Sequence, residues 1–287
     1  MQGELQVTAP QAVQFRGLDG ITLVGDQWNP GTDPAGPVIL MLHGGGQNRH
    51  SWKNTGQILG DRGFRVVAVD TRGHGDSDRA PDADYELDSM VADVTHIIEA
   101  LDAPVVLIGA SMGGLTGIAV ARQLGPERVR KLVLVDVVPR FEESGGARIR
   151  DFMFGNADGF ATLEEAADAI AAYLPHRTKP RSTEGLKKNL RLRDGRWHWH
   201  WDPAFLRTPR GDLVAHTEHL ERAAIELTIP LLLIRGKLSD VVSPEGVADF
   251  LAKVPGAEFV ELGGAGHTAA GDDNDAFSDA VVDFVSR

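Results

Sequence analysis

A serine flanked by glycines stands where a short apolar run meets a segment of small residues. The pattern Gly109-Ala110-Ser111-Met112-Gly113 follows the run VVLIG, and helix-forming residues come after it. A strand, a sharp turn and a helix in this order expose a serine hydroxyl, and a helix N-terminus directs free N–H groups toward developing negative charge. Side chains at the flanking glycines would collide with the neighbouring strand and helix. The pattern predicts a nucleophile at Ser111; the alternative is a glycine-rich connection that happens to contain serine.

A serine nucleophile needs a base and a third group that orients the base. His267 follows the last apolar run of the chain, and Asp240 follows the run before it. Because the carboxyl ends of parallel strands meet at one edge of a sheet, both side chains can reach the serine turn. We therefore predict a triad of Ser111, Asp240 and His267. Asp136, which follows the run LVLV, is the alternative acid, and otherwise a structural carboxylate.

Acyl transfer also needs donors for the tetrahedral oxyanion. The N–H of Met112, the residue after the predicted nucleophile, supplies one. The second is expected from the loop His43-Gly44-Gly45-Gly46, where glycine lets the backbone approach the substrate oxygen. We expect Gly45 to donate, with Gly46 as the second choice. His43 is expected to brace this loop, and its position also makes it a candidate for substrate contact.

A second glycine-rich turn runs from Asp70 to Ser77 with the sequence DTRGHGDS. Its glycines are typical of loops that bind phosphate. The turn lacks both the G-x-x-x-x-G-K-[ST] pattern and the dinucleotide G-x-G-x-x-G spacing. We expect a structural role instead, with Arg72 holding adjacent loops.

The elements that position these residues alternate between short apolar runs and segments of helical periodicity, which predicts a mostly parallel sheet covered on both faces. An antiparallel hairpin is expected first, at Val13–Phe15 and Ile21–Val24. The predicted strands are Pro37–Leu42, Phe64–Asp70, Pro104–Gly109, Lys131–Val138, Pro230–Arg235 and Glu258–Leu262, and the helices are Ser51–Leu59, Leu87–Leu101, Met112–Leu124, Pro244–Val254 and Asp275–Val285. The alternation stops over 139–228. We predict one core, 1–138 with 229–287, and an insertion of 139–228.

The predicted insertion is rich in aromatic residues, among them Phe141 and the run Trp197-His198-Trp199-His200-Trp201. In an extended run the three tryptophans Trp197, Trp199 and Trp201 share one face. They would then form, with Phe141, an apolar wall over Ser111, or else attach the insertion to the core. The histidine pairs His198/His200 and His216/His219 have metal-like spacing without further ligands nearby, so we expect no metal.

Composition narrows the classes of partner. The chain has 287 residues, 29 Lys and Arg against 41 Asp and Glu, and a net charge of −12. This charge argues against nucleic acid and anionic membranes as partners. The absence of cysteine removes disulfides and thiolate chemistry. No signal peptide and no apolar run of membrane-spanning length is present, so we expect a cytoplasmic protein. We also expect a monomer or homodimer without a cofactor.

Taken together, these residues resemble the α/β-hydrolase superfamily over nearly the whole chain. The resemblance rests on His43-Gly44, the pattern D-x-R-G-x-G-x-S at Asp70–Ser77, the turn at Ser111, and Asp240 and His267 in that order. It implies an eight-stranded sheet and a mainly helical cap inserted after the sixth strand. Gly46 departs from a common subpattern that has proline there, and the triple glycine is similar to the loop of some lipases and esterases. Dehalogenases and epoxide hydrolases carry aspartate at the turn, so serine argues against both.

The expected function is hydrolysis of a small, mainly apolar carboxylic ester through an acyl-enzyme. A lactonase, including one for acyl-homoserine lactones, would use the same residues on a cyclic ester. A carbon–carbon bond hydrolase or a perhydrolase would share the triad as well. The alternative outside enzymes is a ligand receptor that uses the hydrolase pocket with little turnover.

Overall fold

The computed structural model describes residues 9–29, 36–175, 182–207, 213–263, 266 and 274–287. Eight strands form one sheet in the order β1-β2-β4-β3-β5-β6-β9-β10. Strand β2 is antiparallel to β1 and β4, and the other neighbours pair in parallel. The strands are β1 (Gln11–Arg16), β2 (Thr22–Trp28), β3 (Val38–Leu42), β4 (Val66–Val69), β5 (Val105–Ala110), β6 (Val129–Val135), β9 (Leu231–Gly236) and β10 (Ala257–Leu262). The predicted hairpin and mostly parallel sheet are confirmed.

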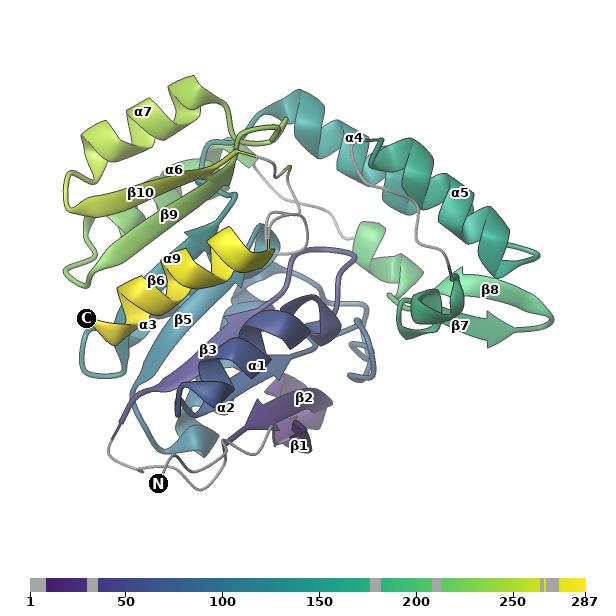
Figure 1. The fold of residues 1–287 in the computed structure, drawn as a ribbon, viewed down its shortest axis with the longest axis horizontal. Coiled ribbons are helices and arrows are strands. Elements are labelled where there is room, and N and C mark those ends of the chain that lie inside the picture. The colour runs from purple at the N-terminus through teal and green to yellow at the C-terminus, as the bar shows by residue number, and fades with distance from the viewer. Residues whose placement is uncertain (1–8, 30–35, 176–181, 208–212, 264–265, 267–273) are drawn as a thin grey trace, which may run out of the picture.

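Helices cover both faces of this sheet (Figure 1). The flanking helices are α1 (Lys53–Asp61), α2 (Leu87–Leu101), α3 (Met112–Leu124), α6 (Leu213–Ile225), α7 (Pro244–Lys253) and α9 (Asn274–Ser286). Helices α1 and α9 contact each other in front of the sheet in Figure 1, whereas α3 contacts α2 and α6 behind it. The two layers have separate apolar cores because alternate residues of a strand point to opposite faces. In β3, Leu40 and Leu42 belong to one core and Ile39 and Met41 to the other.

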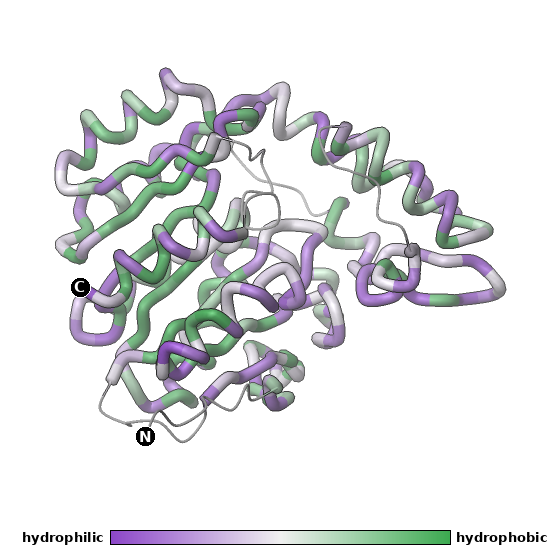
Figure 2. The backbone as a smooth tube through the Cα atoms, in the orientation of Figure 1, coloured by the Kyte–Doolittle hydropathy of each residue, from purple (hydrophilic) through white to green (hydrophobic). Residues whose placement is uncertain are grey.

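Hydropathy follows this arrangement. Figure 2 shows the central strands as hydrophobic along most of their length. All five residues of β3 and all six of β5 are buried, as expected for parallel strands covered on both faces. Among the described residues, none of the helices combines the length and the apolar character that crossing a membrane requires.

The elements between β6 and α6, which we call the insert, project away from the sheet (Figure 1). Its main elements are α4 (Glu143–Phe154), α5 (Leu163–Tyr173), β7 (Leu190–Arg193) and β8 (Arg196–Trp199). The insert has a core of its own, which includes Met153, Phe160 and Trp199. The two long helices agree with the predicted mainly helical insertion, and two further features were not predicted.

The first difference is the antiparallel hairpin of β7 and β8, which the helical expectation missed. Asp194 and Gly195 form its two-residue turn, with φ angles of 50° and 76°. An Asp-Gly pair suits the hairpin turn in which both central residues have positive φ, so the sequence carried a usable signal. The second difference concerns α6, whose residues Leu220 and Ala224 join the core cluster behind the sheet. The last helix of the predicted insertion therefore packs on the core.

Candidate active site

Ser111 occupies a strained turn between β5 and α3. Its backbone has φ 46° and ψ −116°, a positive φ that L residues adopt rarely. The turn is held from both sides: the Ser111 N–H donates to the Val135 carbonyl at 3.1 Å, and its own carbonyl accepts from Gly114 N at 2.9 Å. A non-glycine residue kept in this conformation costs about 1–3 kcal/mol and is typical of functional sites. The strand, turn and helix expected around Ser111 are all present.

The two glycines beside the turn are required by backbone contacts. A Cβ atom on Gly109 would lie 2.4 Å from the Gly113 carbonyl oxygen. A Cβ atom on Gly113 would lie 2.4 Å from the Leu42 carbonyl oxygen. Because backbone atoms cannot move aside as a side chain can, both positions exclude any larger residue. These contacts press the start of α3 against the end of β3, which brings Ser111 beside the loop that follows β3.

That loop is the predicted oxyanion loop, and it lies next to Ser111. A Cβ atom on Gly44 would come within 3.3 Å of the Ser111 Cβ. Within the part of the chain that the structure describes, the N–H groups of Met112 and Gly45 donate to no acceptor. The Gly46 N–H donates to His74 Nε2 at 3.2 Å and is therefore engaged. The geometry thus favours Gly45 over Gly46 as the partner of Met112.

Two buried histidines, His43 and His74, hold the loop that follows β3. His43 Nε2 accepts from Thr71 N at 3.0 Å, and His43 Nδ1 lies 2.8 Å from the Gly44 carbonyl. Burial lowers the pKa of His43 to about 4 and that of His74 to about 3. Both rings are consequently neutral near pH 7, as their accepting Nε2 atoms require. The expected bracing role of His43 is confirmed, and its Nε2 is already engaged by the backbone.

The turn from Asp70 to Ser77 is braced by ion pairs, as expected. Arg72 contacts both carboxylate oxygens of Asp93, through Nε at 2.6 Å and Nη2 at 2.9 Å, and donates to the Asp84 carbonyl at 2.9 Å. Asp70 is fully buried and pairs with Arg49. The structural role predicted for Arg72 is confirmed.

The two candidate acids have different surroundings. Asp136 is fully buried, accepts from Gly236 N at 3.0 Å and from Ser239 Oγ at 2.6 Å, and so supports the turn after β9. Asp240 is partly exposed, and its Oδ2 lies 3.0 Å from Arg148 Nε of α4. His267 lies outside the described residues. The assignment of Asp240 and His267 to the triad stays a prediction.

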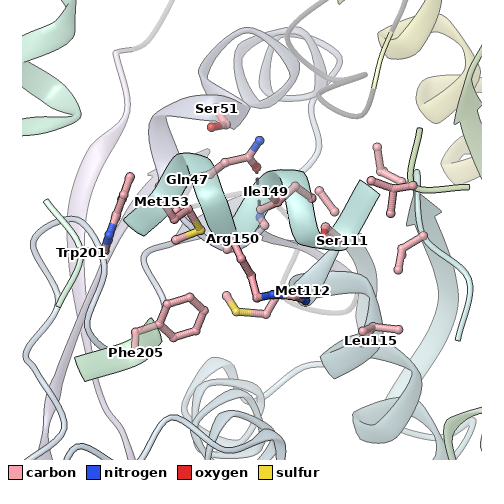
Figure 3. A pocket seen from close by; sticks show the side chains of 18 of the residues that line it. Gln47, Ser51, Ser111, Met112, Leu115, Ile149, Arg150, Met153, Trp201 and Phe205 are labelled. Atoms are coloured by element: carbon pink, nitrogen blue, oxygen red, sulfur yellow. Dashed lines mark hydrogen bonds between the residues drawn. The ribbon is translucent and has the colours of Figure 1, made fainter. Parts of the chain in front are cut away.

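A cavity of about 660 Å³ opens between the serine turn and the insert. Of the predicted substrate contacts, Phe141, Trp199 and Trp201 line it together with Ser111, Met112, Gly45 and Gly46, whereas His43 and Trp197 do not. The Trp199 and Trp201 rings stack with centroids 4.9 Å apart. Figure 3 shows other side chains at the cavity that the sequence-based prediction missed. These are Met153, Ile149 and Arg150 of α4, and Phe205.

Two histidines from the pairs considered for metal binding have contacts of another kind. His200 Nδ1 accepts from Gly75 N at 2.8 Å, and His216 lines the cavity. Within the described ranges, no three side chains of His, Asp or Glu gather in a metal-binding arrangement.

Two known proteins similar to this chain are an esterase and an oligomer hydrolase. The esterase Rv0045c of Mycobacterium tuberculosis is 30% identical over 260 residues, which cover 85% of this chain and 81% of that protein. The 3-hydroxybutyrate-oligomer hydrolase of Cupriavidus necator is 32% identical over 250 residues, covering 82% of this chain and 84% of the relative. Both alignments span most of each protein.

Solved structures agree on the fold. The crystal structure of E-2-(acetamidomethylene)succinate hydrolase superposes with a TM-score of 0.83 at 23% identity, over 97% of this chain and 100% of the other. At this identity the likeness shows the fold alone. Residues 37–273 match the family described as the alpha/beta hydrolase fold, which is most of the sequence. Together with the eight-stranded sheet and the serine turn, this match shows that the chain belongs to the α/β-hydrolase fold family.

Proposed function

We propose that this protein is a serine hydrolase that cleaves small carboxylic esters with a mainly apolar body. The observation that carries the proposal is the strained Ser111 turn, which opens directly into a cavity lined by apolar and aromatic side chains. In a purely structural role Ser111 could be replaced by glycine, which adopts this backbone conformation without strain. The strained and exposed hydroxyl therefore supports a chemical role.

In the proposed reaction, His267 takes the proton of Ser111 Oγ as the hydroxyl attacks the ester carbonyl, and Asp240 orients the imidazole. The N–H groups of Met112 and Gly45 stabilise the oxyanion. Collapse of the tetrahedral intermediate breaks the bond to the alcohol oxygen, which leaves with the proton from His267. Water, deprotonated by His267, then attacks the acyl-enzyme and releases the acid, with the proton returned to Ser111.

The insert acts in this proposal as a cap that shields the reacting carbonyl. Trp199, Trp201 and Phe205 supply aromatic walls, and exclusion of water strengthens the hydrogen bonds to the oxyanion. The similar protein that is named as an esterase supports the same class of reaction.

The test combines turnover and labelling. Ser111→Ala is expected to lower hydrolysis of p-nitrophenyl butyrate by at least about 10³-fold, because the covalent step is lost. A fluorophosphonate probe is expected to label Ser111 in the unaltered protein and nothing in the variant. Unchanged circular dichroism and melting would show that the variant is folded. Retained turnover in Ser111→Ala refutes the proposal, and failure of the probe to label a folded, unaltered protein favours a receptor.

A further inference from the structure

Among the described residues that line the cavity, the charge balance is opposite to that of the chain. Among the described lining residues, Lys53, Arg150 and Lys188 carry positive charge and Glu86 is the acidic residue. The whole chain has 41 acidic residues against 29 lysines and arginines. A concave, partly apolar site lined by cations raises the local concentration of anionic ligands. The cavity therefore favours a substrate that carries negative charge.

Arg150 is the cation that the insert contributes to the described lining of the cavity from helix α4. It lies on α4 between Ile149 and Met153, and Figure 3 shows its side chain extending into the cavity in the direction of Met112 and Ser111. Its neighbours there are mainly apolar. A guanidinium placed among apolar groups loses hydration, and without a partner this loss destabilises the protein.

No such partner is present for Arg150 within the described residues, where it forms neither an ion pair nor a hydrogen bond. Arg148, two positions earlier on the same helix, differs: it pairs with Asp240 and stacks on Tyr173, with 5.1 Å from its guanidinium carbon to the ring centroid. Arg140 and Arg191, also in the insert, pair with Glu221 and Asp76. A guanidinium left unpaired inside a site, beside paired neighbours, is available to a ligand.

We propose that Arg150 binds a carboxylate of the substrate, so that the preferred substrate is an ester that also bears a free carboxylate. This inference rests on the proposed esterase function and specifies its substrate class. A guanidinium binds a carboxylate through two parallel N–H···O bonds, which fixes the orientation of the ester relative to Ser111. Candidate substrates are monoesters of dicarboxylic acids, with the charge on the acyl side, and esters of hydroxy acids, with the charge on the alcohol side.

The experiment compares esters that differ by a terminal methyl or carboxylate. Monoethyl adipate is paired with ethyl hexanoate for the acyl side, and 4-acetoxybutanoate with butyl acetate for the alcohol side. Release of acid is followed in a pH-stat, and kcat/KM is measured for each ester. Arg150→Met removes the charge with little change of volume, Arg150→Lys keeps the charge without the two-point geometry, and Arg122→Met removes an exposed arginine of α3 that pairs with Glu226 outside the cavity.

The unaltered protein is expected to prefer the charged member of at least one pair. Arg150→Met is expected to lower kcat/KM for that ester by about 10- to 100-fold, with a much smaller change for its neutral partner. For the charged ester, kcat/KM of Arg150→Lys should lie between the values of the unaltered protein and of Arg150→Met. Arg122→Met should keep the preference for the charged ester.

Two failures are distinguishable. If both members of each pair are hydrolysed and Arg150→Met leaves their ratio unchanged, the carboxylate site is refuted while the esterase function stands. The same holds if the unaltered protein prefers the neutral members of both pairs. If the unaltered protein hydrolyses none of the four esters and the fluorophosphonate does not label Ser111, the proposed function itself fails. Should Arg150→Met not fold, Arg150→Lys carries the test, because an unchanged ratio in that variant also refutes two-point binding.

Discussion

The serine turn and the insert face the same cavity, but different forces fix their positions. At the turn, backbone atoms are in contact: Gly113 has no room for a side chain beside the Leu42 carbonyl. In the insert, side chains determine the walls, as in the stack of Trp199 on Trp201. The position of Ser111 is thus encoded in a short pattern of small residues. The shape and charge of the cavity are encoded in residues far apart in the sequence.

The largest expected effect on stability comes from filling the space at the turn. Gly113→Ala should destabilise the protein by several kcal/mol and lower ester turnover by more than about 100-fold, because the methyl group would push α3 away from β3. Gly256→Ala is the matched control, since a Cβ atom there meets nothing within 4 Å. Urea unfolding and kcat/KM for p-nitrophenyl butyrate measure both effects. A Gly113→Ala variant as stable and active as the Gly256→Ala variant would contradict the difference drawn between the two regions.

The second prediction concerns the acids near the contact between the core and the insert. Asp240→Asn should lower kcat by about 10³- to 10⁴-fold with little change of stability, as loss of the orienting acid does in known triads. Asp136→Asn should instead cost about 1 kcal/mol of stability, because its carboxylate holds the turn at Gly236 and Ser239, while kcat changes little. Thermal melting and single-turnover kinetics separate the two outcomes. The reverse pattern would make Asp136 the triad acid.

The smallest expected effect lies in the aromatic wall. Trp201→Phe removes part of a cavity-lining ring and should lower kcat/KM for a hexanoyl ester by about threefold to tenfold, mainly through KM. Trp197→Phe should change it by less than about twofold, because Trp197 does not line the cavity. Steady-state kinetics with acetyl and hexanoyl esters make the comparison. Equal losses in the two variants would mean that the tryptophans act through the stability of the insert.

Local patterns predicted the core and the serine turn. The runs before Ser111, Asp136 and Asp240 are strands β5, β6 and β9. Glycine placement predicted the strained turn, because a turn of this shape tolerates few other residues. The boundary of the insertion was harder to place, since the amphipathic pattern of α6 does not reveal that it packs on α3.

The contents of the cavity depend on tertiary contacts. Alternation along an extended run predicted that Trp197 and Trp199 share a face, yet of these two Trp199 alone lines the cavity, together with Trp201 beyond the end of β8. Arg150 carries no local pattern, because an arginine on a helix is usually solvated. Its significance depends on the absence of an ion-pair partner among the described residues, which only the three-dimensional structure shows.

The positive φ of Ser111 has a consequence for the evolution of the protein. A residue held in that conformation makes the native state less stable than a glycine there would. Reactivity and robustness are therefore opposed at this position, and the sequence that folds best is not the sequence that reacts best. Selection for heat tolerance alone would favour glycine at this position. The serine is therefore explained by selection for something other than stability.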